Sequence, residues 1–521
     1  MSNLGHGEPT WLSLLPPLLA IGGALVFKRV VPALALGVLV GAAMVHGAVA
    51  APLRFFDRYL WNALTDSGHQ WILALALCLG GMIRVISKTD IAASMAGGLT
   101  RYATTRRRGQ LTSWVLGVLF FFDDYVNTLF VGSTMGSIRK KLRISKEKLA
   151  FVVDATAAPV ASLAPISTWI ATEIAYIGDQ IDALGIEGDA FGLFLRSLSS
   201  RYYSWLMLAT VLLVAITNRD MGPMLKAERR AATEVADDEP ERPTETTASI
   251  GWLAAWLPIL LVLVAVTAGV FVTGYLGATD AGAEITPASV LNNAESSKVM
   301  VLGALIGGIA AVLIAARSPR HNLRDATRSW GSGGLSMLHV MAVLLLAWAL
   351  GDLCRDDLNT AGFLVSVLGP GFDPGLLPAM VFLVSAITSF ATGTSWGTMG
   401  IMFPLAVPMA HQLAPGNEAV LLSTISSILA GSVFGDHCSP ISDTTIMSAM
   451  ATECDQIAHV RTQLPYALLV GTVSVIFGCV PVGLGIWPAW LALLMGAITI
   501  FLVLHVVARP VEERTEITGG P

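Results

Sequence analysis

The sequence predicts an all-α polytopic membrane protein built from two inverted-topology repeats, with re-entrant hairpins and broken transmembrane helices. Of 521 residues, 54% are hydrophobic and only 13% are charged, whereas soluble domains carry about 25% charged residues. Roughly a dozen apolar segments approach the length of about 20 residues that spans a bilayer. The two other observations behind this prediction are a matched pair of polar stretches and the distribution of basic residues.

The polar stretches interrupt hydrophobic spans, one in each half of the chain. The first is FDDYVNT at residues 122–128, followed by VVDATAAP at 152–159. The second is ATGTSWG at 391–397, followed by GDHCSPISDTT at 435–445. Carboxylates, hydroxyls, glycine and proline at such depth are tolerated where they line a cavity or bind a ligand. A matched pair of them indicates a secondary transporter with its site at the repeat interface.

Basic residues predict the first hairpin. The clusters at residues 106–108 and 139–148 both belong in the cytoplasm by the positive-inside rule. About 30 largely apolar residues separate them, whereas two full crossings would need about 40. We therefore expect a re-entrant hairpin with its tip at residues 123–128.

The same reasoning divides the chain into four parts. We expect a first repeat at residues 1–217, a cytoplasmic linker at 218–249, a second repeat at 250–485, and a terminal transmembrane helix with a cytoplasmic tail at 486–521. The linker is charged and contains proline, which favours a flexible connection. Upstream of each hairpin, residues 81–99 and 351–368 resemble one another. Each should be a helix end followed by a short amphipathic helix along the interface.

Proline predicts a broken helix after each hairpin. Pro159 and Pro165 interrupt the span at residues 149–174, and Pro440 interrupts the span at 420–450. Proline removes a backbone donor and frees the carbonyl four residues earlier. A broken helix thus offers bare carbonyls to a cation and half-helix N-termini to an anion.

Polar side chains at these interruptions are the candidate ion and substrate ligands. Carboxylates inside a membrane are functional candidates by default, and here they are Asp123, Asp124, Asp154, Asp436 and Asp443. His437 titrates near neutral pH when unperturbed. Neutral oxygens come from Asn127, Thr128, Thr156, Thr392, Thr394, Ser395, Ser439, Ser442 and Thr444. Hard cations prefer oxygen ligands, and we expect Na+ at Asp154, Asn127, Thr128, Thr392, Asp436 and Ser439.

Enzyme motifs in these stretches carry little weight. Adjacent residues such as Asp436, His437 and Cys438 rarely converge on one zinc ion, and no paired Cys/His spacing supports such a site. GTSWG at residues 393–397 matches G-x-S-x-G, but that motif requires a preceding strand, and here it lies in an apolar hairpin. The five cysteines show no CxxC spacing. We expect neither enzymatic activity nor a cofactor.

The three motifs FDDYVNT, ATGTSWG and GDHCSPISDTT resemble the NhaC family of sodium/proton antiporters. The resemblance covers nearly the whole chain, and the last motif is the most specific. It implies the ion-transporter superfamily fold and sodium/proton antiport. It also implies that a relative of this kind can carry amino acids or small carboxylates.

Two functions therefore stay open. The first is a sodium/proton antiporter that exchanges Na+ for H+ by alternating access. The alternative is a sodium-coupled transporter of an amino acid or small carboxylate, with a solute pocket at Trp396, Tyr125 and Trp169. The expected partners are the lipid bilayer, small ions and, in the alternative, an organic solute, with no nucleic acid. We expect a multi-pass protein of the cell inner (plasma) membrane, and a homodimer is left open.

Overall fold

A computed structural model describes residues 10–27, 29–96, 100–186, 188–233, 250–282, 284–286, 289–290, 293–369 and 371–511. Within these ranges eight helices are long and apolar enough to cross a membrane, and a ninth span arises if one bent pair of helices is counted. The described strands are two residues each and pair antiparallel. The expected all-α polytopic membrane fold is confirmed.

The elements follow one another in two halves, where η marks short 3-10 and π segments. The first half contains η1 (Trp11–Leu14), α1 (Leu15–Phe27), α2 (Val30–His46), α3 (Ala51–Arg54), η2 (Phe55–Leu60), α4 (Trp61–Thr65), α5 (Ser67–Lys88), α6 (Asp90–Ala96), η3 (Thr100–Tyr102), α7 (Arg106–Leu119), α8 (Asp124–Arg139), α9 (Lys146–Ala155), α10 (Ala158–Ala161), α11 (Thr168–Leu184), α12 (Ala190–Ser197), η4 (Leu198–Ser200) and α13 (Tyr202–Thr217). The second half contains β1 (Arg219–Asp220), α14 (Gly222–Thr233), α15 (Trp252–Asp280), α17 (Ser296–Ala315), α18 (Leu323–Ser336), α19 (Leu338–Asp352), η5 (Leu353–Asp357), α20 (Thr360–Leu368), η6 (Pro374–Leu376), α21 (Leu377–Thr392), α22 (Ser395–Leu413), α23 (Glu418–Cys438), α24 (Asp443–Ala451), α25 (Gln456–Val473), η7 (Ser474–Cys479), α26 (Val480–Gly483), α27 (Ala489–Val507) and β2 (Arg509–Pro510).

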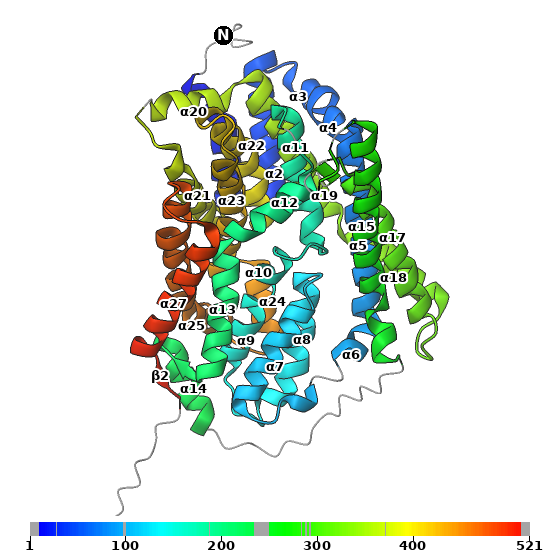
Figure 1. Cartoon of the computed structure of the whole chain (residues 1–521), viewed down its shortest axis with the longest axis vertical. Helices are drawn as coiled ribbons and strands as arrows, with labels where there is room; N and C mark the ends of the chain where they lie inside the picture. The colour runs from blue at the N-terminus through cyan, green and yellow to red at the C-terminus, as the bar shows by residue number, and fades with distance from the viewer. Residues whose placement is uncertain are drawn as a thin grey trace, which may run out of the picture.

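Matching elements of the two halves lie at opposite ends of the molecule. The short helix α6 follows α5 at the lower end in Figure 1, and its counterpart α20 follows α19 at the upper end. The hairpin α7–α8 lies in the lower half, whereas α21 and α22 lie in the upper half (Figure 1). This arrangement is the inverted repeat that the sequence predicts.

The first hairpin turns earlier than expected. The non-helical residues are 120–123, and Asp124 already begins α8. Asp123 is the N-cap residue, and its side chain accepts a hydrogen bond from the backbone N–H of Val126 at 2.7 Å. Because an N-cap carboxylate satisfies a free donor of the first turn, helix begins immediately after it. Asn127 and Thr128, expected at the tip, therefore lie one turn inside α8.

The second hairpin turns at a glycine. Gly393 has φ +68°, in the left-handed region that favours glycine, and Thr394 then caps α22. A Cβ at Gly393 would lie only 2.7 Å from the carbonyl oxygen of Ile441. The absence of a side chain thus lets the hairpin tip touch the chain between α23 and α24.

The broken helices are confirmed as well. α9 ends at Ala155, and the chain is irregular again at residues 162–167, between α10 and α11. α23 ends at Cys438, and residues 439–442 separate it from α24. A further break was not predicted: the segments Ala190–Ser200 and Tyr202–Thr217 meet at 51°.

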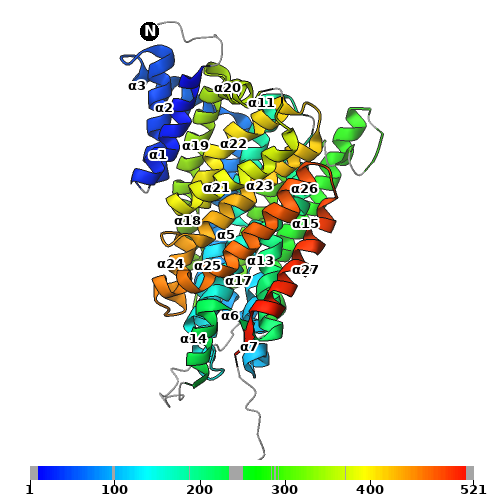
Figure 2. The same ribbon diagram turned by 90° about the vertical axis from the view of Figure 1, so that its left-hand side faces the viewer.

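The expectation of a flexible connection from residue 218 is wrong for residues 219–233. These residues form β1 and α14, and α14 lies against α9 and α25 at the lower end of the molecule (Figure 2). Buried ion pairs hold them there: Asp220 bonds to Lys148, and Glu228 bonds to Arg106. The sequence hides this anchoring because the partners lie 72 and 122 residues away. The rest of the expected linker at 234–249, the first nine residues and the tail after 511 lie outside the described residues.

Cysteine labelling tests the hairpin. We expect Arg107→Cys and Lys141→Cys, on a background without the five native cysteines, to react with an impermeant thiol reagent only from the cytoplasmic side. Both positions are exposed and flank the hairpin. Val49→Cys is the matched control and should react from outside. Val49 lies in the turn between α2 and α3, and this residue is 98% exposed. Labelling of positions 107 and 141 from opposite sides would contradict the re-entrant geometry.

Candidate functional site

The chain breaks of the two repeats lie next to each other. The backbone N–H of Thr168, at the start of α11, donates to the carbonyl of Phe122 at 2.9 Å. Its hydroxyl donates to Asp123 at 3.0 Å. Between the repeats, the hydroxyl of Tyr125 lies 3.5 Å from a carboxylate oxygen of Asp443. The first hairpin tip therefore contacts α11 and the start of α24.

Asp436 is the carboxylate at this junction with an oxygen left free. One oxygen accepts a hydrogen bond from the hydroxyl of Ser395 at 3.0 Å. The other, Oδ1, is buried without a hydrogen-bond partner in the described part of the chain. The charge of Asp436 interacts with those of Asp124, Asp154 and Asp443. A buried carboxylate with an unmet lone pair and acidic neighbours calls for a cation or a proton.

Asn127 and Thr128 add neutral oxygens on the first hairpin. The amide nitrogen of Asn127 donates to the carbonyls of Gly117 and Thr156, at 2.6 and 2.8 Å. These two bonds fix the orientation of the amide group, so that Asn127 Oδ1 is its hydrogen-bond acceptor. Neither Asn127 Oδ1 nor the Thr128 hydroxyl has a partner among the described residues, and both residues are fully buried. These atoms are oxygen donors of the kind that a hard cation prefers.

Asp154 is enclosed by hydrogen-bond donors. Its oxygens accept from side chains of α24 and α25, namely Thr445 at 3.2 Å, Ser448 at 3.3 Å, His459 at 3.2 Å and Gln463 at 2.8 Å. We call these five residues the Asp154 node. The node joins α9 of the first repeat to the second repeat. In this conformation a cation at Asp154 would have to displace donors.

His437 lies beside the Asp154 node rather than beside the free oxygens. Its Nδ1 lies 2.6 Å from the hydroxyl of Tyr203, and its Nε2 lies 3.8 Å from Asp154. The carbonyl of His437 also accepts from Gln463. Asp436 and His437 are thus adjacent in sequence but face different groups.

The remaining candidates serve their own helices in this conformation. Thr156 and Thr392 each donate to the carbonyl four residues earlier, both at 2.8 Å. Thr394 caps α22. Ser439 accepts from the backbone of Ile441 at 3.3 Å. Ser442 and Thr444 bond to each other at 3.1 Å. Of the described hydroxyls expected to bind a cation, the Thr128 hydroxyl is the one without a competing partner.

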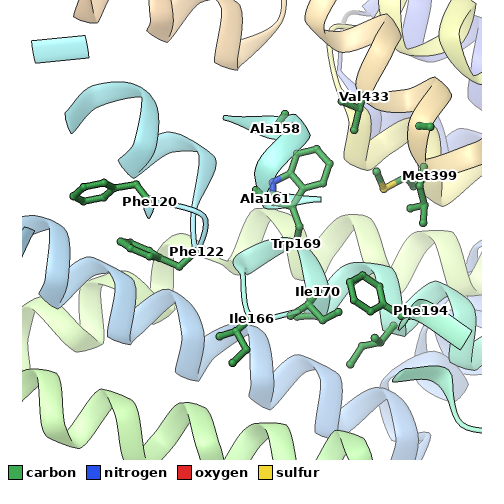
Figure 3. Close-up of a cluster of buried hydrophobic side chains, with 14 of the residues drawn as sticks. Phe120, Phe122, Ala158, Ala161, Ile166, Trp169, Ile170, Phe194, Met399 and Val433 are labelled. Carbon is green, nitrogen blue, oxygen red and sulfur yellow. The ribbon is translucent and has the colours of Figure 1, made fainter. Parts of the chain in front are cut away.

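An apolar shell encloses the junction. Figure 3 shows Trp169 between the hairpin residues Phe120 and Phe122 on one side and Met399 and Val433 of the second repeat on the other. The ring of Trp169 also lies 5.1 Å from that of Trp396. Such a shell lowers the local dielectric, which strengthens charge interactions inside it.

The sequence reasoning missed several buried charged and polar residues. His459 and Gln463 lie one turn apart on α25 and complete the Asp154 node; this polar i, i+4 pair in an apolar helix was the available signal. Glu173 and Arg201 form an ion pair at 2.6 Å with at most 1% exposure of either side chain. Arg201 lies at the 51° bend, at the start of an apolar helix. It also bonds to the carbonyl of Ser162.

The family model described as the Na+/H+ antiporter family matches residues 160–482. The chain belongs to the Na+/H+ antiporter family. The resemblance to NhaC antiporters is thereby confirmed. The match spans both halves, from α10 to α26.

Several proteins are similar to this antiporter-family chain over all or part of its length. An uncharacterized protein of Haemophilus influenzae is 31% identical over 93% of this chain and 92% of its own length. An uncharacterized Na(+)/H(+) antiporter of the same organism is 37% identical over 20% of this chain and 22% of its own. A malate-2H(+)/Na(+)-lactate antiporter of Bacillus subtilis is 35% identical over 18% and 19%. The solved YdaH transporter of Alcanivorax borkumensis has a TM-score of 0.58 at 16% identity, covering 84% of this chain and 90% of that one.

Together, family and fold identify a multi-pass membrane protein that is a secondary transporter handling ions, and not an enzyme. The YdaH likeness shows the fold alone.

Proposed function

We propose that this transporter exchanges Na+ for H+ by alternating access in the cell inner (plasma) membrane. The observation that carries the proposal is the free oxygen of Asp436, buried where the two repeats meet. Family membership supports it. Asp436, Asn127 and Thr128 would supply the first ligands, because each has an oxygen without a partner among the described residues.

The other proposed sodium ligands would join by rearrangement. Thr392 and Ser439 lie at the second hairpin and at the break after α23, where a small backbone change would release their hydroxyls. Asp154 would act through its charge, which already interacts with that of Asp436.

Coupling follows from competition for the same carboxylates. Asp123, Asp124 and Asp436 are almost wholly buried, and the charge of Asp124 interacts with those of the other two. Carboxylates so close in a poorly solvated place cannot all stay charged without a counterion. Either a proton or Na+ neutralises them, so the arrival of one displaces the other. One site reached from alternate sides would then exchange the two ions.

Uptake into proteoliposomes tests the exchange. We expect an outward proton gradient, acidic inside, to drive radioactive sodium into the vesicles against its concentration gradient. Collapse of the pH gradient should abolish this accumulation, and protein-free vesicles are the control. Sodium uptake that is independent of the pH gradient but requires an added organic solute would contradict antiport.

A second candidate is sodium-coupled carriage of an amino acid or small carboxylate. The observation that favours it is the match to the malate-2H(+)/Na(+)-lactate antiporter, which is partial. The aromatic residues Trp169 and Trp396 lie together at the junction, while Tyr125 contacts Asp443. The same vesicles assayed with a panel of organic acids and amino acids separate the two functions. The homodimer stays a prediction.

A further inference from the structure

A cavity of about 340 Å³ lies between α5 and the first hairpin. One face of α5 lines it with Arg84, Ser87 and Lys88, and one face of α8 lines it with Leu129 and Ser133. Asp123 and Tyr125 at the hairpin tip also line it, and the junction of α18 and α19 closes it. The volume falls within the range of about 300–1,000 Å³ that is usual for small-molecule sites.

Two cations in this cavity have no partner within the described part of the chain. Arg84 and Lys88 are exposed, and no hydrogen bond or ion pair joins the charged group of either to another described residue. Buried cations nearer the core are paired: Lys148 with Asp220, and Arg201 with Glu173. Charged residues in membrane spans normally pair with one another or face a cavity that serves transport. The two cations of α5 follow the second pattern.

A role as interface anchors explains these residues less well. Lys88 ends α5, where a basic residue is ordinary. Arg84, however, lies one turn further in, and both residues line the same cavity as Ser87, Ser133 and Tyr125. An anchor to lipid headgroups needs no cavity between two helices. The combination instead suits an anion held by charge-assisted hydrogen bonds.

We propose that this cavity binds a small organic monocarboxylate, whose carboxylate lies between Arg84 and Lys88. When Asp123 is ionised, the two cations and its carboxylate leave a formal charge of one positive unit, which a single negative charge balances. Val126 and Leu129 offer apolar surface to the rest of the solute. Because Asp123 also lines the cavity, a solute hydroxyl would find an acceptor at the hairpin tip.

The proposal rests on the transporter function and deepens it. The solute would contact α5 on one side and α8 on the other, next to the proposed ion ligands Asn127 and Thr128. Occupancy of the cavity would therefore influence the hairpin that holds the ions. This names a solute class and a site for the sodium-coupled alternative, and it is compatible with exchange of Na+ for H+ in the absence of solute.

Binding to purified full-length protein in lipid nanodiscs tests the proposal. The probes are acetate, lactate, malate, inorganic phosphate and short-chain phosphatidylglycerol, each measured by calorimetry. We expect saturable binding of lactate, tighter than binding of malate or phosphate. Arg84→Gln and Lys88→Gln should each weaken lactate binding about 10-fold or more, because a charge-assisted hydrogen bond is lost. Arg101→Gln, an exposed cation outside the cavity, should leave it unchanged.

Two other results would overturn the assignment. Binding of phosphatidylglycerol alone, lost in the same two variants, would make the cavity a lipid-headgroup site. Absence of any carboxylate binding, or equal binding in all variants, would remove it as a solute site. Sodium-dependent proton flux without solute is measured on the same protein reconstituted into proteoliposomes. Its loss with retained lactate binding would refute the antiport proposal and leave the solute site standing.

Discussion

Asp436→Asn will lower sodium-dependent proton exchange by about 100-fold or more, while the protein still folds. Removing one partner of a buried charge pair costs about 3–5 kcal/mol, and about 1.4 kcal/mol corresponds to tenfold in affinity. The amide keeps the acceptor for the Ser395 hydroxyl, so packing should survive. It cannot take up a proton or neutralise a dehydrated cation. Initial rates in proteoliposomes measure the effect.

Two further variants test whether the loss of exchange is specific to Asp436. Asp182→Asn changes an exposed carboxylate of α11 and should transport normally. Asp154→Asn should also lose exchange, but with a lowered melting temperature, because the new amide group would face the donors of the Asp154 node. Normal sodium dependence in Asp436→Asn would mean that this carboxylate is structural and that the ion binds elsewhere.

Arg201→Met will destabilise the protein by about 3–5 kcal/mol, since it leaves the buried carboxylate of Glu173 without its counterion. The change also removes bonds to the carbonyl of Ser162 and the hydroxyl of Ser197. These bonds hold the 51° bend against the irregular chain after α10. Thermal unfolding of detergent-solubilised protein, followed by size-exclusion chromatography, measures the loss.

The double variant Arg201→Met with Glu173→Gln separates charge from packing. We expect it to be more stable than Arg201→Met alone, because no buried charge is left unpaired. Arg196→Met is the matched control. Arg196 pairs with Glu418, both side chains are exposed, and an exposed pair contributes about 0–1 kcal/mol to the free energy of unfolding. Equal stability of the single and double variants would show that the Glu173 charge is solvated by other means.

The sequence anticipated what local chemistry determines. Asp123 lies at the first hairpin turn because it caps α8. The left-handed turn at Gly393 was not predicted, although glycine is the residue that favours it. Pro440 marks the break after α23. The inverted topology followed from short basic clusters, since their placement obeys the positive-inside rule.

What the sequence could not give are pairings between distant segments. Lys148 reads as one more cytoplasmic basic residue, yet it is fully buried against Asp220. Asp154 was predicted to be a sodium ligand, yet in this conformation its carboxylate oxygens accept hydrogen bonds from side chains of α24 and α25. Which side of a helix such a group faces depends on how the repeats pack, and no local pattern encodes that. Arg84 shows the reverse case: it lies near the end of an apolar span, where a basic residue is ordinary, yet it lines a cavity in the fold.

Proton release on sodium binding tests the central claim most directly. Purified protein in weak buffer, with a pH indicator dye, should release protons when sodium chloride is added and none with choline chloride. The release should disappear in Asp436→Asn and persist in Asp182→Asn. The apparent sodium affinity should fall as pH is lowered, because protons occupy the shared carboxylates. Sodium binding with no proton release, and with an affinity independent of pH, would contradict exchange at one shared site.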